Sequence, residues 1–157
     1  EWSRQGTHET TRLCLAAIEK YFDRESFLDV GTGTGILSIA AAKLSPHALI
    51  EACDTDAEAV LIARENARLN GVAERISFRQ GTLDEAATSS ADVVCANLTA
   101  DIIVPLLPGL VAATCGRLIL SGILETQTEL VRQSLHGLGV TQEIELAAKG
   151  EWTAMII

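Results

Sequence analysis

Residues 27–40 read Phe27-Leu28-Asp29-Val30-Gly31-Thr32-Gly33-Thr34-Gly35-Ile36-Leu37-Ser38-Ile39-Ala40. A short apolar segment ends in an acid, three glycines alternate with threonines, and an alanine-rich helical pattern follows. Glycines at a strand-to-helix turn let the backbone bend tightly and approach a ligand closely, because no Cβ intervenes. The first N–H groups of the helix beyond them are unpaired. This pattern predicts a loop that binds a nucleotide-type cofactor; the alternative is a glycine-rich turn without a ligand.

The spacing of the glycines distinguishes between cofactors. A dinucleotide fingerprint, Gly-x-Gly-x-x-Gly, would need glycine at position 36, where Ile36 stands. The order Asp-x-Gly-x-Gly-x-Gly instead resembles the first motif of class I methyltransferases, which use S-adenosylmethionine (SAM). The acid at Asp29 suits a cofactor with an ammonium and a sulfonium better than one with a pyrophosphate. We therefore expect Asp29, Gly31, Gly33 and Gly35 to bind SAM.

Composition and charge narrow the class of protein. The chain has 157 residues, 48% hydrophobic and 21% charged, which is typical of one globular domain. No apolar run reaches the roughly 18 residues of a membrane span, so no membrane partner is expected. The formal net charge of −9 argues against direct binding of nucleic acid, which requires Lys and Arg. It is compatible with a cationic cofactor, with a basic protein substrate, or simply with solubility.

The four cysteines are far apart and form no Cys-x-x-Cys pair. We expect buried, reduced thiols in a cytoplasmic protein rather than a metal site or a disulfide framework. The cysteines are Cys14, Cys53, Cys95 and Cys115.

Strand-like and helix-like segments alternate along the chain, which predicts an α/β fold. The last two expected strands have no helical pattern between them and should form an antiparallel hairpin. The sequence thus predicts a seven-stranded, mainly parallel, Rossmann-like sheet in a single domain, residues 1–157, with one longer polar loop at 84–91. The expected strands are 27–30, 49–53, 76–79, 92–96, 117–121, 141–147 and 152–157, and the expected helices are 10–22, 35–44, 56–70, 102–113 and 125–136.

In open α/β sheets the ligand lies across the carboxyl ends of the strands. Asp54 ends the second strand about 20 residues beyond the glycine loop, where a carboxylate can accept hydrogen bonds from both ribose hydroxyls; the alternative is a capping acid beside Asp56. After the third strand, Thr82 could bind the adenine and Leu83 lie against its face. Asn97 leaves the fourth strand where a transferable methyl would lie, although it could instead cap the next helix.

Six motifs, taken in order, resemble the family of bacterial ribosomal protein L11 methyltransferases (PrmA). The resemblance covers nearly the whole chain and implies SAM-binding positions at Thr11, Gly31, Asp54 and Asn97. The residues alone also indicate the last three, whereas Thr11 comes from the resemblance. The motifs are residues 6–15, 29–37, 53–56, 96–100, 120–124 and 150–152.

The resemblance implies a SAM-dependent N-methyltransferase that acts on lysine side chains or the α-amine of a large-subunit ribosomal protein. The family's N-terminal domain, which recruits that protein, has no counterpart in residues 1–157, so we expect the catalytic domain alone. We expect Asn97 to hold the attacking amine, and we expect no metal. Three alternatives remain: a methyltransferase for another protein or a small molecule, an NAD-binding oxidoreductase, and a non-catalytic module with this fold.

Overall fold

A computed structural model describes residues 4–23, 26–83 and 90–157, and the side chains from residue 8 onward. The expected polar loop at 84–91 lies mostly outside these residues. No helix of the described part is both long and apolar enough to cross a membrane. The helices are α1 (Arg4–Tyr21), α2 (Ile36–Leu44), α3 (Ala57–Leu69), α5 (Ala100–Ala113) and α6 (Thr128–Gly137), and the strands are β1 (Ser26–Val30), β2 (Leu49–Asp54), β3 (Ile76–Gln80), β4 (Ala91–Asn97), β5 (Thr114–Leu124), β6 (Glu145–Lys149) and β7 (Trp152–Ile156).

The seven strands form one sheet in the order β3-β2-β1-β4-β5-β7-β6. β1 pairs in parallel with both β2 and β4, so the order of the strands reverses direction at β1. The β6–β7 hairpin adds the two antiparallel pairs, β5 with β7 and β7 with β6. This arrangement confirms the predicted mainly parallel sheet with an antiparallel end. A ligand site is expected where the strand order reverses, at the carboxyl ends of β1 and β4.

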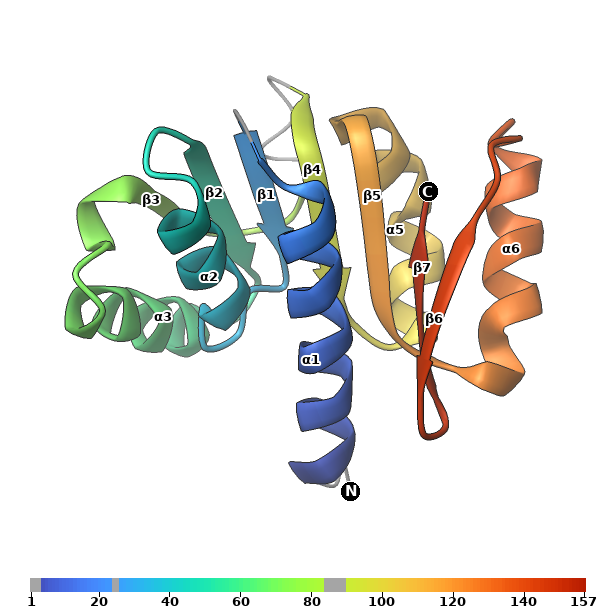
Figure 1. The fold of residues 1–157 in the computed structure, drawn as a ribbon, viewed down its shortest axis with the longest axis horizontal. Helices are drawn as coiled ribbons and strands as arrows, with labels where there is room; N and C mark the ends of the chain where they lie inside the picture. Colours follow the sequence, from blue (N-terminus) through green and yellow to red (C-terminus); the bar gives the residue numbers. More distant parts are fainter. Residues whose placement is uncertain (1–3, 24–25, 84–89) are drawn as a thin grey trace.

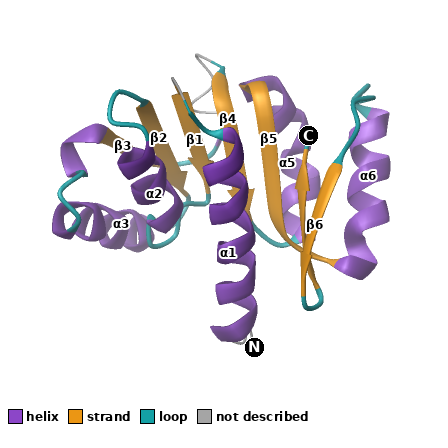
Figure 2. Cartoon of the chain, viewed as in Figure 1, coloured by secondary structure: helices purple, strands orange, loops and turns teal. Residues whose placement is uncertain are grey.

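Helices cover both faces of the sheet. The central strand β1 sends alternate side chains to opposite faces, and on both faces these side chains are buried against helices. Phe27 lies in the apolar cluster that packs under α1, α2 and α3. Leu28 and Val30 lie in the second cluster, which α5 and α6 cover. Figure 2 shows α1 in front of the strands and α5 behind β5. The two clusters hold the sheet from both sides and leave the strand ends free to carry the loops.

Two predicted helix boundaries are confirmed. Asp56 caps α3, since its side chain accepts a hydrogen bond of 2.9 Å from the Glu58 N–H. The helix ends at Asn70-Gly71, where Gly71 has φ +72°. The Val72 N–H donates to the Ala67 carbonyl across that turn, at 3.0 Å.

Several boundaries differ from the prediction. α1 begins at Arg4 rather than at Thr10, so Thr10 lies inside the helix. The apolar spacing marks only the turns that pack on the sheet, and the polar first turns carry no such signal. α5 begins at Ala100, two residues before the expected start at 102. β5 runs from Thr114 to Leu124, longer than expected at both ends.

Three of the cysteines are buried free thiols, as expected: Cys14, Cys53 and Cys95. Cys14 of α1 and Cys95 of β4 face one another, with 3.7 Å between the sulfur atoms. Cys115 is exposed, contrary to the expectation, and its thiol lies 3.5 Å from a carboxylate oxygen of Asp92. It stands at the start of β5, at the rim of the sheet, where burial by the flanking helices ends.

Candidate functional site

The glycine loop connects β1 to α2 at the carboxyl edge of the parallel strands, which is the lower edge in Figure 1. Two successive amides, the N–H groups of Gly31 and Thr32, donate to the carbonyl of Cys53 at 2.9 and 3.0 Å. The Gly35 N–H donates back to the Thr32 carbonyl at 2.9 Å, which closes the turn. All three glycines have positive φ, and a Cβ built on Gly33 would meet nothing within 4 Å. The middle of the loop is therefore open.

Asp29 is buried beneath this loop, with 1% of its surface exposed. Its Oδ2 accepts hydrogen bonds from the hydroxyls of Thr32 and Ser38, at 2.8 and 2.9 Å. Its Oδ1 is also buried and has no donor among the described residues. Burial raises the pKa of Asp29 to about 6, against the opposing effect of the two hydroxyl bonds, and the charge of Asp54 raises it further. The carboxylate thus has one oxygen for which the described residues supply no donor.

Asp54 ends β2 and connects that strand to the glycine loop. Its Oδ2 accepts a hydrogen bond of 2.9 Å from the Gly33 N–H. Its Oδ1 accepts one of 3.0 Å from the Asp56 N–H. Asp54 therefore takes part in the turn before α3, while Asp56 is the residue that caps the helix. Each carboxylate oxygen has a second lone pair, so Asp54 can hold the loop and still accept hydroxyl donors from a ligand.

Asn97 is the last residue of β4, directly after Ala96, which pairs with Val30 at the end of β1. Its side-chain carbonyl oxygen is buried and has no donor in the described part of the chain. The N-cap of α5 is Thr99, so the alternative role of Asn97 as the helix cap is wrong. The buried oxygens of Asp29 and Asn97 thus come from neighbouring strands beside the same loop.

The other predicted residues lie in two places, in α1 and directly after β3. Thr11 is half-buried in α1, and the Ser121 hydroxyl donates to the preceding Thr10 carbonyl at 3.3 Å, which joins this turn of α1 to the end of β5. Thr82 is half-buried beyond β3. Leu83 is 3% exposed and packs in the cluster of α5, against Gly109. Contact of Thr82 and Leu83 with adenine stays a prediction, and Leu83 already has a packing role.

Sequence reasoning missed the two hydroxyls that hold Asp29. Thr32 follows the acid by three residues inside the motif and could have been found, since a side-chain bond across a tight turn suits that spacing. Ser38 lies in the first turns of α2, and no local pattern connects it to Asp29.

Comparison with known proteins gives a consistent result. The model of the family described as ribosomal protein L11 methyltransferase (PrmA) matches residues 5–157. The ribosomal protein L11 methyltransferase of Desulfitobacterium hafniense is 45% identical over 89% of this chain and 46% of its own length. That of Trichlorobacter lovleyi is 42% identical over 96% of this chain and 51% of its own. The chain belongs to the PrmA family.

Solved structures agree with this assignment, and more distant ones show only that the fold is shared. The ribosomal protein L11 methylase of Lactobacillus delbrueckii superposes with a TM-score of 0.85 at 33% identity, covering 94% of this chain and 76% of that one. An RNA methyltransferase of Salinibacter ruber, in complex with S-adenosyl-L-homocysteine, has a TM-score of 0.69 at 23% identity, over 90% of this chain and 85% of its own; it shows the shared fold alone. The chain spans about half the length of the curated PrmA relatives.

Gly33→Val tests whether the open middle of the loop is where a ligand lies. We expect loss of SAM binding with the fold retained, because the valine side chain would enter open space rather than other protein atoms. Gly71→Val is the matched control, since Gly71 has a similar positive φ, +72°, and equally open surroundings away from the loop. Calorimetric titration with SAM measures both, and wild-type affinity in the Gly33 variant would reduce the loop to an ordinary turn.

Asp29→Asn tests the electrostatics of the buried carboxylate. Folding raises its pKa from 3.8 to about 6, so the charged form is disfavoured in the folded chain and wild-type stability falls as the pH rises from about 4 to about 6. Asparagine can still accept from Thr32 and Ser38 but carries no charge. We expect the variant to be more stable than wild type at pH 8, by about 1–3 kcal/mol, and the difference to shrink towards pH 4. Urea unfolding midpoints of both proteins at pH 4 and pH 8 measure this difference in stability. A difference that does not change with pH would contradict the prediction.

Proposed function

We propose that this chain is the catalytic unit of a SAM-dependent protein N-methyltransferase. One observation carries the proposal. Two buried acceptor oxygens that have no donor within residues 4–23, 26–83 and 90–157, Asp29 Oδ1 and Asn97 Oδ1, lie on neighbouring strand ends beside a loop that is open at Gly33. Buried acceptors that lack donors are unfavourable unless a ligand supplies them. A cofactor with an ammonium group, bound along this edge, fits that need better than one with a pyrophosphate.

In this proposal, different residues of the chain bind different parts of the cofactor. Asp29 faces the ammonium end, and the backbone of Gly31, Gly33 and Gly35 allows close approach. Asp54 accepts from the ribose hydroxyls with its remaining lone pairs. The other proposed contacts are those of Thr11, Thr82 and Leu83. The bound cofactor supplies a methyl group on a sulfonium, an electrophile that needs no further activation by the protein.

The protein's part in the reaction is to deliver a neutral amine in line. A lysine amine near its ordinary pKa of 10.4 costs about 4–5 kcal/mol to deprotonate at pH 7, whereas an α-amine near 7.7–8 costs about 1 kcal/mol. Asn97 Oδ1 accepts a hydrogen bond from the amine and so orients its lone pair. An apolar surrounding at the end of β4 lowers the pKa of the amine, because burial disfavours the cation. Orientation of this kind contributes much of what an enzyme can offer in such a displacement.

The proposed acceptor is a ribosomal protein, as in the relatives named ribosomal protein L11 methyltransferase. A net charge of −9 suits a basic protein partner and disfavours direct binding of nucleic acid. Such a substrate also agrees with the expected cytoplasmic location. Another protein or a small molecule is the alternative acceptor. Calorimetry with SAM against NAD separates a methyltransferase from an oxidoreductase, and turnover separates an enzyme from a non-catalytic module.

Asp54→Ala is expected to weaken SAM binding at least tenfold. The carboxylate's hydrogen bonds to hydroxyls are charge-assisted, at roughly 1.5–3 kcal/mol each. Asp56→Ala is the control, because it removes the cap of α3 without touching the loop and should lower stability while sparing affinity. Titration calorimetry and thermal unfolding of both variants make the comparison. Unchanged affinity in a folded Asp54 variant would mean that the ribose lies elsewhere.

Asn97→Ala is expected to lower kcat more than it weakens SAM binding, since its contact with the amine matters most in the transition state. A loss of about 10²–10³ in rate is expected by analogy with single preorganised groups at other sites. The assay follows methylation of ribosomal protein L11, of peptides and of free amines by the wild type and the variant. Equal losses in rate and affinity would make Asn97 a cofactor ligand only. No turnover on any amine by the wild type, with the family's recruiting domain fused in front, would defeat the proposed activity.

A further inference from the structure

β5 is irregular beside the site. Its pairing with β7 shifts register between Leu120 and Ile123, and Gly122 within that interval has φ +88°. A Cβ built on Gly122 would lie 2.4 Å from the carbonyl oxygen of Leu98 and 2.9 Å from its carbonyl carbon. Contacts that short do not occur, and here the obstacle is backbone rather than a side chain that could move aside. The Leu98 backbone occupies the space that a side chain at position 122 would fill.

Leu98 is fixed on two other sides as well. Its N–H donates to the Ser121 carbonyl at 3.0 Å. Its side chain covers the first glycine of the loop, since a Cβ on Gly31 would lie 2.6 Å from Leu98 Cδ2. The residue directly after Asn97 is therefore held between the β5 irregularity and the glycine loop. These contacts restrict the movement of the peptide bond between Asn97 and Leu98.

We propose that Gly122 is a positioning residue for Asn97: by admitting the Leu98 backbone against β5, it sets where the Asn97 side chain stands relative to the glycine loop. The inference rests on the proposed function for its catalytic consequence, but the placement of Asn97 can be measured without turnover. A β-carbon at position 122 displaces the Leu98 carbonyl, and Asn97 moves with it. The ribose acceptor Asp54 is on β2, beyond β1 and β4 from this contact, and is not displaced.

The first experiment compares Gly122→Ala with Gly139→Ala. Gly139 follows α6, has φ +83° and would place its Cβ in open space, so the control carries the same backbone strain without the collision. The readout is the side-chain amide signal of Asn97 in a ¹H–¹⁵N spectrum, assigned by its absence in Asn97→Ala. We expect Gly122→Ala to shift this signal and Gly139→Ala to leave it in place. An unmoved signal in a folded Gly122 variant overturns the proposal, whether or not the chain has methyltransferase activity.

The second experiment is a double-mutant cycle on kcat. A misplacement of about 1 Å at a reacting group can cost about 10²-fold, so we expect Gly122→Ala to lower kcat at least tenfold and to change SAM affinity much less. In the Asn97→Ala background the same substitution should have almost no further effect on kcat, because the residue through which it acts is gone. Additive losses would mean that Gly122 affects kcat independently of Asn97, and would overturn the proposal while leaving the proposed function intact.

Leu98→Ala keeps the test open if Gly122→Ala does not fold. It removes the side chain over Gly31 but leaves the backbone contact with Gly122 in place. We expect a smaller shift of the Asn97 amide signal and a kcat loss that again disappears in the Asn97→Ala background. An unshifted signal together with an additive kcat loss would show that Leu98 does not link Asn97 to the loop and would contradict the proposal.

Discussion

A carboxylate buried at the end of a strand is the constraint around which this site is organised. Asp29 is 1% exposed; the hydroxyls of Thr32 and Ser38 both bind its Oδ2, while its Oδ1 has no donor in the part of the chain that the structure describes. Taking a carboxylate out of water without full hydrogen bonding is unfavourable, which is why its pKa rises to about 6. Thr32 and Ser38, which compensate in part, belong to the loop and to α2. The same bonds that offset the burial therefore also fix the loop and the start of the helix relative to β1.

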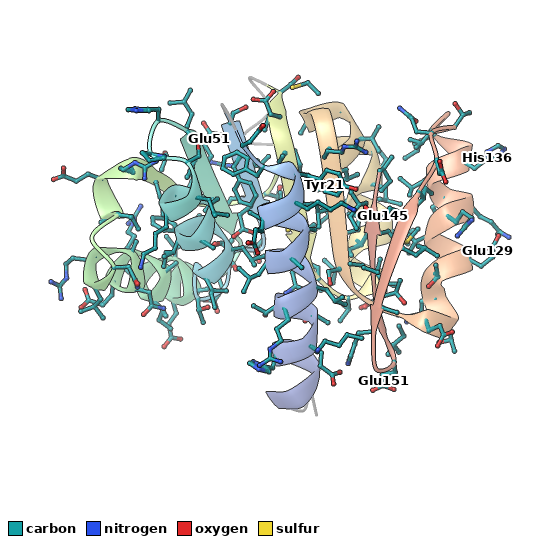
Figure 3. All side chains as sticks on the ribbon, in the orientation of Figure 1. Tyr21, Glu51, Glu129, His136, Glu145 and Glu151 are labelled. Atoms are coloured by element: carbon teal, nitrogen blue, oxygen red, sulfur yellow. The ribbon has the colours of Figure 1, made fainter. Side chains whose placement is uncertain are left out.

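The position of the loop is set mainly by backbone amides. Gly31 and Thr32 donate to the Cys53 carbonyl, and Gly33 donates to Asp54, so β2 holds the loop from one side. On the other side Leu98, next after β4, lies over Gly31 and donates to Ser121 of β5. Figure 1 shows these strand ends along one edge, with the start of α1 at the same edge, and Figure 3 places Glu151 of the β6–β7 turn there too. Far from it, Tyr21 donates to Glu145 and joins the other end of α1 to β6.

The fold was largely predictable because its signals are local and repeated. Apolar runs of strand length alternated with helical spacing, and Asn70-Gly71 and Asp56 gave correct ends for α3. The errors lie where tertiary packing rather than local pattern decides. The polar first turns of α1 have no apolar stripe, and the added length of β5 comes from pairing with other strands, with β4 at its start and with β7 at its end.

The site residues predicted from the residues alone share one property: each stands at or just beyond the end of a strand, or in the glycine motif, where sequence position alone implies the sheet edge. Thr11, which came from the family resemblance, lies in α1 instead. What the sequence could not reveal are contacts between elements distant along the chain, such as Ser38 with Asp29 or Gly122 with Leu98. The motif at residues 120–124 includes Gly122, but only the fold shows that the Leu98 carbonyl oxygen would lie 2.4 Å from a Cβ at this position. A glycine inside a strand is unfavourable for the sheet, and its use here follows from the need to seat another backbone beside the site. The register shift in β5 at Gly122 makes room for the Leu98 backbone, and in our proposal this contact fixes the position of Asn97.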